Sequence, residues 1–150
     1  MALLDVLGEQ WVRVGVAGED KEEVLEELVD ALVRANQVTD REAALAALLE
    51  RERLGTTGIG GGVAIPHGKH ESVTTLTAAL GTSPNGIEWE AADGEPVYLV
   101  FLVLAEANNP GPHVQLLADI ARLLKTPGLR QRLVAADSPD GVMRLIGEVS

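Results

Sequence analysis

The chain has 150 residues, 46% of them hydrophobic, a formal net charge of −11 and no cysteine, so we expect one globular domain over residues 1–150. The acidic charge argues against nucleic acid and anionic membrane surfaces, which bind through Lys and Arg, and the missing cysteines exclude disulfides, thiolate chemistry and Cys-ligated zinc. We find neither a signal peptide nor the ~18 apolar residues of a spanning helix, and we expect a cytoplasmic protein without direct membrane insertion.

Strand and helix signals alternate in the first third of the chain. Alternating hydrophobicity predicts a strand over residues 11–16. Capping signals at Asp20 and Asp40 predict two helices, the first ending near Arg34 and the second at Gly55. We expect the apolar stripes of the two helices to face the core: Val24, Leu25, Leu28 and Leu32, then Ala44, Leu45, Leu48 and Leu49.

The middle of the chain predicts short strands separated by turns. Strands are predicted over residues 63–65 and 74–80 and around Ile87 and Trp89. Residues 97–104 are continuously apolar, which is typical of a strand covered on both faces. Pro, Asn, Asp and Gly predict turns at 83–86 and 93–94.

Helical signals return in the last third of the chain. The helix that follows residue 109 is expected to bury one face, made by Val114, Leu117, Ile120, Ala121 and Leu124. Thr126-Pro127 and Ser138-Pro139 each place a cap residue before a proline at the first helical position, predicting two short closing helices. Because helices and strands interleave, we expect α/β layers with a sheet between helices.

His67 stands in the most informative segment of the chain. It follows the glycine-rich residues 58–62, a short apolar stretch and Pro66. Glycines leave backbone N–H groups open to an anion, proline fixes the backbone before the ring, and Lys69 adds positive charge. The pattern predicts an imidazole at a strand end beside a polar loop. It suits a nucleophilic or phosphate-carrying histidine, although an ordinary surface histidine fits as well.

Other candidate residues have weaker contexts. His113 lies in the first turn of a predicted helix, where it either donates a hydrogen bond to a phosphoryl oxygen or is simply exposed. Arg51 and Arg53 end a helix on different faces, so one of them pairs with phosphate, or both only complement the helix dipole. The spacing of His67 and His70 lacks the remaining ligands of a metal site, so we expect no metal there and expect His70 to point to solvent.

The segment 51–69 resembles a known protein family. Its sequence, RERLGTTGIGGGVAIPHGK, is similar to the IIA component of the bacterial phosphoenolpyruvate-dependent sugar phosphotransferase system, of the fructose/mannitol type. The resemblance covers about residues 18–146 and includes GIEW at 86–89 and HVQLL at 113–117. It implies an α/β fold with a mixed central sheet flanked by helices. Gly61 departs from the pattern, because relatives often carry a polar residue there, commonly asparagine.

The resemblance also implies a mechanism. His67 matches the histidine that accepts a phosphoryl group from the small carrier HPr, through Nε2, and passes it to a IIB domain or uses it to switch a regulatory target. His113 matches the second active-site histidine, and Arg51 matches the associated arginine. No cofactor, nucleotide or metal is implied. We therefore expect a phosphotransferase component with a transient phosphohistidine, cytoplasmic and monomeric or weakly dimeric.

The resemblance leaves two roles open. One is a transport phosphocarrier that feeds a sugar permease. The other is a regulatory interaction protein of nitrogen or potassium signalling, whose phosphorylation only gates the binding of partners. The Thr-Gly-Ile-Gly sequence in a free-standing chain favours the nitrogen-regulatory branch.

Overall fold

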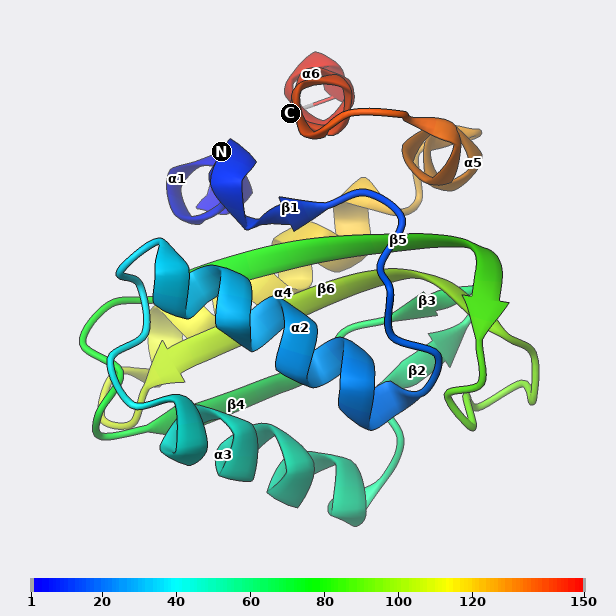
Figure 1. Cartoon of the computed structure of the whole chain (residues 1–150). Helices are drawn as coiled ribbons and strands as arrows, with labels where there is room; N and C mark the ends of the chain where they lie inside the picture. The colour runs from blue at the N-terminus through cyan, green and yellow to red at the C-terminus, as the bar shows by residue number, and fades with distance from the viewer. Residues whose placement is uncertain (1, 150) are drawn as a thin grey trace.

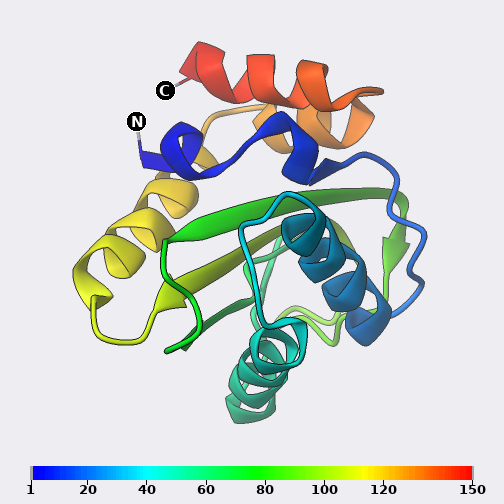
Figure 2. The same ribbon diagram turned by 60° about the vertical axis from the view of Figure 1, so that its left-hand side comes forward.

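A mixed sheet lies between two layers of helices in the computed structural model, which describes residues 2–149 (Figures 1 and 2). One face is covered by α2 (Lys21–Arg34) and α3 (Arg41–Leu54). The helices of the other face are α1 (Ala2–Val6), α4 (Pro110–Leu123), α5 (Leu129–Ala135) and α6 (Pro139–Val149). In both views α1 and α6, the first and last helices, are neighbours. The predicted α/β fold with a mixed, helix-flanked sheet is confirmed.

Strand β6 is the centre of the sheet. The strand order is β1 (Val12–Arg13), β5 (Thr77–Ile87), β6 (Val97–Glu106), β3 (Val63–Ala64) and β2 (Gly58–Gly60). Strand β4 (His67–His70) also pairs with β6, beyond β3. The β5–β6 and β2–β3 pairs are antiparallel, and the other three pairs are parallel. One side of β6 therefore carries β5, and the other carries β3 and then β4.

The core has two halves because the side chains of β6 alternate between the two faces of the sheet. Leu99, Phe101 and Val103 pack under α1, α4, α5 and α6, and Leu102 and Leu104 pack under α2 and α3. Each of these five residues is at most 1% exposed. Burial of each such side chain contributes about 1.5–3 kcal/mol to folding. The prediction that residues 97–104 form a strand covered on both faces is confirmed.

Helices α2 and α3 form where their sequence signals predicted. The Asp20 carboxylate accepts a hydrogen bond from the Glu23 N–H at 2.9 Å, and the Asp40 carboxylate accepts one from the Ala43 N–H at 3.0 Å. Such a cap contributes about 1 kcal/mol. The predicted apolar stripes are buried, except that Leu49 is partly buried.

The predicted strand over residues 11–16 is shorter in the structure. Only Val12 and Arg13 join the sheet, beside β5. Trp11 ends the short 3-10 helix η1 (Glu9–Trp11), and Gly15, with a left-handed φ of 69°, interrupts the ladder, although the Val16 N–H still donates to the Thr82 carbonyl of β5 at 2.8 Å. The alternation of apolar and polar residues does indicate a strand, but the 3-10 helix before Val12 and the left-handed Gly15 after Arg13 keep that strand short.

The turn predicted at residues 83–86 is wrong. These residues continue β5, which begins at Thr77 rather than at residue 74 and shifts its register on β6 between Thr82 and Ile87. Pro84 is tolerated because the β1 ladder ends at Gly81, so no strand there needs its missing N–H. By contrast, the turn predicted at 93–94 is confirmed, with the Gly94 N–H donating to the Ala91 carbonyl at 2.9 Å.

The predicted buried face of α4 was partly wrong. Ile120 and Leu124 are buried, but Ala121 is exposed and Val114 is 64% exposed. The buried stripe contains Leu116, Ile120 and Leu123. Apolar residues adjacent in the sequence give this helix two possible apolar faces. Packing against β6 selects the face that continues from His113 by steps of three and four residues.

The two closing helices differ in how they begin. The start of α6 at Pro139 is confirmed, because the Ser138 hydroxyl accepts a hydrogen bond from the Gly141 N–H at 3.0 Å. The predicted start at Pro127 is wrong. There Thr126 closes a turn with Leu129, and α5 begins after Gly128, whose φ of 77° is left-handed.

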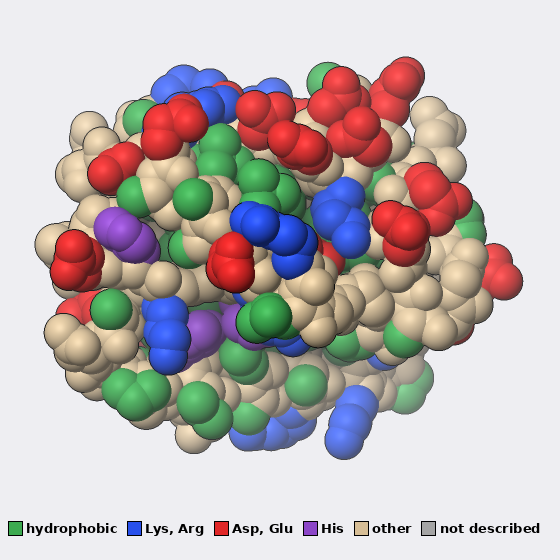
Figure 3. Space-filling model, turned by 90° about the horizontal axis from the view of Figure 1, so that it is seen from below, with side chains coloured by type: hydrophobic (Ala, Val, Ile, Leu, Met, Phe, Trp, Pro, Cys, Tyr) green, Lys and Arg blue, Asp and Glu red, His purple; other side chains and the backbone are tan. Residues whose placement is uncertain are grey.

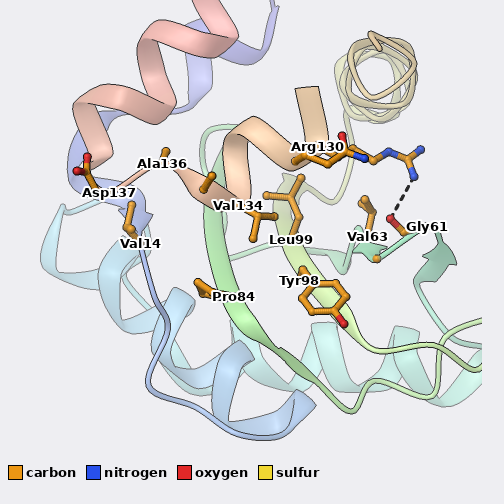
Figure 4. Close-up of a pocket in the computed structure, with 13 residues that line it drawn as sticks. Val14, Gly61, Val63, Pro84, Tyr98, Leu99, Arg130, Val134, Ala136 and Asp137 are labelled. Atoms are coloured by element: carbon orange, nitrogen blue, oxygen red, sulfur yellow. Dashed lines mark hydrogen bonds between the residues drawn. The ribbon is translucent and has the colours of Figure 1, made fainter. Parts of the chain in front are cut away.

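The glycine hairpin between β2 and β3 is fixed from outside by Arg130 of α5. Its Nη1 donates to the Gly61 carbonyl at 3.2 Å, and its Nε donates to the Leu124 carbonyl at 3.3 Å (Figure 4). Gly61 has a φ of 66°, and a Cβ there would collide with Arg130 Nη1. The glycine that departs from the family pattern thus makes room for this guanidinium.

A cavity of about 810 Å³ lies between this hairpin, β6 and α5 (Figure 4). Its walls are mainly apolar, with Val63, Leu99 and Val134 among them. Neither His67 nor His113 lines it. Because the cavity separates much of α5 from the hairpin, Arg130 provides a direct polar link between them.

We predict that Gly61→Asn and Arg130→Ala are coupled in stability. Asparagine tolerates a left-handed backbone, so its main effect at residue 61 is to displace the guanidinium and lose one hydrogen bond, about 0.5–1.5 kcal/mol. In the Arg130→Ala background this loss should disappear. Urea unfolding of the two single variants and the double variant measures the coupling.

Gly94→Asn is the matched control. Gly94 has a φ of 75°, and a Cβ there meets nothing within 4 Å. Its substitution should therefore add to that of Arg130 without coupling. Additive effects of the residue 61 and residue 130 substitutions, within about 0.3–0.5 kcal/mol, would contradict this account of the glycine.

Candidate active site around two histidines

His67 begins β4, a strand that the sequence did not predict, whereas the strand predicted over residues 63–65 is β3 at Val63–Ala64. It pairs in register with Val103 of β6, and the Val103 N–H donates to the Pro66 carbonyl at 2.9 Å. Since paired residues of parallel strands point to the same face, the ring of His67 lies on the α4 side of the sheet. Gly68 faces the opposite side, where a Cβ would come within 3.1 Å of the Ala47 backbone of α3.

The fold brings His67 and His113 together. Their ring centroids are 5.6 Å apart, and the rings are inclined at 70°. His113 reaches this position because it continues the inward stripe of α4. The space-filling view in Figure 3 shows two histidine side chains next to each other at the surface, beside basic and hydrophobic side chains. The two histidines singled out from the sequence therefore form one site.

His113 is in an environment that disfavours its charged form. Burial lowers its pKa from the ordinary imidazole value, and the nearby positive charges of His67 and Lys69 lower the pKa further. Its Nε2 atom is buried and has no hydrogen-bond partner among the described residues. A neutral imidazole with an unpartnered nitrogen is thus held beside His67.

A hydrogen bond to the backbone sets the tautomer of His67. Its Nδ1 lies 2.9 Å from the carbonyl oxygen of Ile65. A carbonyl oxygen accepts but does not donate, so Nδ1 carries the proton in this contact. In the neutral ring Nε2 then has a free lone pair, which is the state required of a nucleophile.

The two arginines at the end of α3 point in different directions, as predicted. Arg51 is half-buried, and its Nη1 donates to the Gly55 carbonyl at 2.8 Å. It follows Ala47, the residue beside Gly68, by one helical turn, and so lies on the face of α3 that packs on β4. Arg53 is exposed and pairs with Glu50 at 3.0 Å.

His70 belongs to a different environment from His67. Three residues apart on one strand, the two side chains point to opposite faces. His70 is half-buried rather than directed freely to solvent, and its Nδ1 lies 2.8 Å from the Ser72 hydroxyl. Within residues 2–149 no cluster of three His, Asp or Glu side chains is arranged to hold a metal.

Exposed apolar side chains occur on α3, β2 and α4. Leu54 at the end of α3 is 79% exposed, Ile59 in β2 is 52% exposed, and Val114 is 64% exposed. Sequence reasoning did not identify these residues as functional and placed Val114 inside. The signal that reveals them, large apolar side chains left in solvent, exists only once burial is known.

Comparison with known proteins places residues 5–149 in one family. Residues 5–149 match the family described as phosphoenolpyruvate-dependent sugar phosphotransferase system, EIIA 2. The fructose-specific EIIA component of Haloferax volcanii is 41% identical over 129 residues, covering 86% of this chain and 84% of that protein. The fructose-specific EIIABC component of Bacillus subtilis is 34% identical over 148 residues, which are 99% of this chain but only 23% of that protein.

A solved structure gives the same result. Nitrogen regulatory protein IIA-Ntr from Neisseria meningitidis superposes with a TM-score of 0.87 at 30% identity, covering 95% of this chain and 97% of that one. None of the helices in residues 2–149 is long and apolar enough to cross a membrane. The chain belongs to the type 2 EIIA family of the phosphoenolpyruvate-dependent phosphotransferase system and is a phosphocarrier of that system.

Proposed function

We propose that His67 carries the phosphoryl group, accepting it at Nε2 from an HPr-type carrier. The observation that carries this proposal is the hydrogen bond from Nδ1 to the Ile65 carbonyl, which leaves the Nε2 lone pair free. Phosphoryl transfer needs chiefly positioning and charge stabilisation, so neither a cofactor nor a metal is required. The result is a transient phosphohistidine, which makes the chain a phosphotransferase component that turns over stoichiometrically.

His113 is proposed to hold the phosphoryl group once it is on His67. The unpartnered Nε2 of His113 is a ready hydrogen-bond donor for a phosphoryl oxygen. Arrival of the negative phosphoryl group also removes one cause of the lowered pKa, the positive charge of His67. The pKa of His113 therefore rises on phosphorylation, which strengthens this hydrogen bond.

Arg51 is proposed to be the mobile cation of the site. In the unphosphorylated protein its guanidinium is held by the Gly55 carbonyl. A guanidinium has further donors and prefers charged oxygens to a neutral carbonyl. Although α3 covers the face of the sheet opposite the His67 ring, β4 pairs only with β6 among the described strands, so the long Arg51 side chain can pass the free edge of β4 and exchange this carbonyl for a phosphoryl oxygen on His67.

The exposed apolar residues Leu54, Ile59 and Val114 are proposed to form the rim on which HPr docks.

From His67 the phosphoryl group passes to a IIB domain or, in the nitrogen-regulatory branch that we favour, controls a regulatory partner. The identity with the fructose-specific relatives keeps sugar transport as a second candidate. Transfer from the phosphorylated chain to a purified fructose-type IIB domain distinguishes them, since a purely regulatory protein does not transfer. We place the protein in the cytoplasm, where this phosphotransfer chemistry occurs.

The first prediction from this proposed function is that His67→Ala abolishes phosphorylation while the protein remains folded. The substitution removes a half-buried polar side chain, so stability should change by less than about 1 kcal/mol. Incubation with phosphoenolpyruvate, enzyme I and HPr, read by intact mass, tests it. His70→Ala is the control and should be phosphorylated normally; acid-labile phosphate on the His67 variant would refute the assignment.

The second prediction concerns His113. His113→Ala should still accept a phosphoryl group, but transfer should slow by roughly ten- to a hundredfold, because a donor to a charged oxygen contributes about 1.5–3 kcal/mol. Single-turnover kinetics in both directions measure this. In the wild type, NMR titration should give a below-normal pKa for His113 that rises when His67 is phosphorylated. An unchanged pKa together with wild-type transfer would reduce His113 to a packing residue.

The third prediction concerns the encounter with HPr. With a net charge of −11, the chain should attract the basic face that HPr-type carriers present, as the family resemblance implies. Stopped-flow association should therefore slow as the ionic strength rises from about 0.01 to 0.15 M, over which the screening length falls from about 30 to 8 Å. Dissociation, which depends on the apolar rim, should change less. An association rate independent of salt would exclude charge steering.

A further inference from the structure

Glu52, near the end of α3, is a nearly buried carboxylate. Its side chain is 5% exposed, and its Oε2 accepts a hydrogen bond from Lys21 Nζ at 3.0 Å. Lys21 comes from the first turn of α2, and its ammonium lies 5.6 Å from the ring centroid of Trp89. Buried carboxylates persist where they are paired and hydrogen-bonded. The ion pair with Lys21 meets part of that requirement.

The remaining contacts of the Glu52 carboxylate go to Thr57. The Thr57 backbone N–H donates to Oε2 at 3.3 Å, and the Thr57 hydroxyl donates to Oε1. Thr57 is itself 4% exposed and stands immediately before β2. Both carboxylate oxygens of Glu52 therefore hold one residue at the base of the glycine hairpin.

The contacts continue from Thr57 to the ring of His67. The Thr57 carbonyl accepts a hydrogen bond from the Ile65 N–H at 3.0 Å. The Ile65 carbonyl in turn accepts the hydrogen bond from His67 Nδ1 at 2.9 Å. A continuous series of hydrogen bonds and backbone thus joins a buried carboxylate to the imidazole.

We propose that Glu52 is a positioning residue for phosphoryl transfer, acting through Thr57 and Ile65 to fix the ring orientation and tautomer of His67. This inference rests on the proposed role of His67. In the step itself the Nε2 lone pair forms the new N–P bond, while the N–P bond of the donor breaks and its electron pair stays on the donor nitrogen. Nδ1 keeps its proton throughout and donates it in the hydrogen bond to the Ile65 carbonyl. Displacement of that carbonyl removes the preference for the reactive tautomer.

Thr57 offers the sharpest test, because its substitutions leave the Lys21–Glu52 ion pair in place. Thr57→Val keeps the shape of the side chain and removes the hydroxyl donor, and Thr57→Ser restores that donor. Glu52→Gln is the complementary variant, since an amide has one acceptor oxygen where the carboxylate has two. Glu50→Gln is the matched control, because Glu50 on the same helix end is 64% exposed and pairs with Arg53 rather than with Thr57.

Two measurements separate positioning from mere support of the fold. The first is the long-range ¹⁵N–¹H NMR spectrum of the His67 ring at neutral pH, which reports the tautomer and needs no phosphorylation. The second is single-turnover transfer from phosphorylated HPr, with the rate and the half-saturating HPr concentration determined separately. Thermal unfolding accompanies both.

For Thr57→Val and Glu52→Gln we expect mixed His67 tautomers and a transfer rate lowered about tenfold, the fold-change that corresponds to one lost hydrogen bond of ordinary strength. The half-saturating concentration should stay within about twofold, and Thr57→Ser and Glu50→Gln should match the wild type. An unchanged tautomer in Thr57→Val, or a rate that falls only with thermal stability, overturns the proposal. If wild-type His67 is never phosphorylated, the phosphocarrier assignment fails instead, and the NMR comparison still decides whether Glu52 sets the tautomer.

Discussion

The pairing of β4 with β6 is the constraint on which the site depends. Pro66 lacks an N–H and contributes to the ladder only by accepting from Val103, after which His67 lies opposite that residue. Side-chain alternation then directs the imidazole toward α4 and leaves Gly68 against α3. A shift of register by one residue would exchange these faces and bury the imidazole against α3. The small size of Gly68 is what lets α3 pack closely enough to hold this register.

Sequence reasoning succeeded where local signals are strong and failed where the sheet decides. The caps at Asp20 and Asp40 locate the starts of α2 and α3, and the continuous apolar sequence of β6 is enough to predict a buried strand. By contrast, His-Gly-Lys-His has little strand propensity, and β4 exists because one side of β6 is available to it. Pairing with β6 on both sides of Pro84, at Thr82 and Ile87, likewise keeps this residue in a strand where its neighbours predict a turn.

The site was predictable as a list of residues but not as an arrangement. The glycine-rich segment before His67 and the place of His113 in the first turn of a helix distinguish both histidines in the sequence. Their separation of 5.6 Å follows from how α4 rotates on the sheet, and the sequence offered two apolar stripes for that helix. Likewise, nothing local indicates that the Arg51 guanidinium is held by the Gly55 carbonyl, because that contact depends on how the chain leaves α3.

The proposed site leaves one hydrogen-bonding position open for the phosphoryl group. His113 Nε2 is buried and has no hydrogen-bond partner among the described residues. A phosphoryl group on His67 would supply that partner, which under the proposed assignment favours acceptance from the donor. The burial that lowers the pKa of His113 remains after phosphorylation, so it limits the rise in that pKa which the phosphoryl charge causes. Since a neutral donor binds a charged oxygen less strongly than a cation does, the group remains transferable to the next protein.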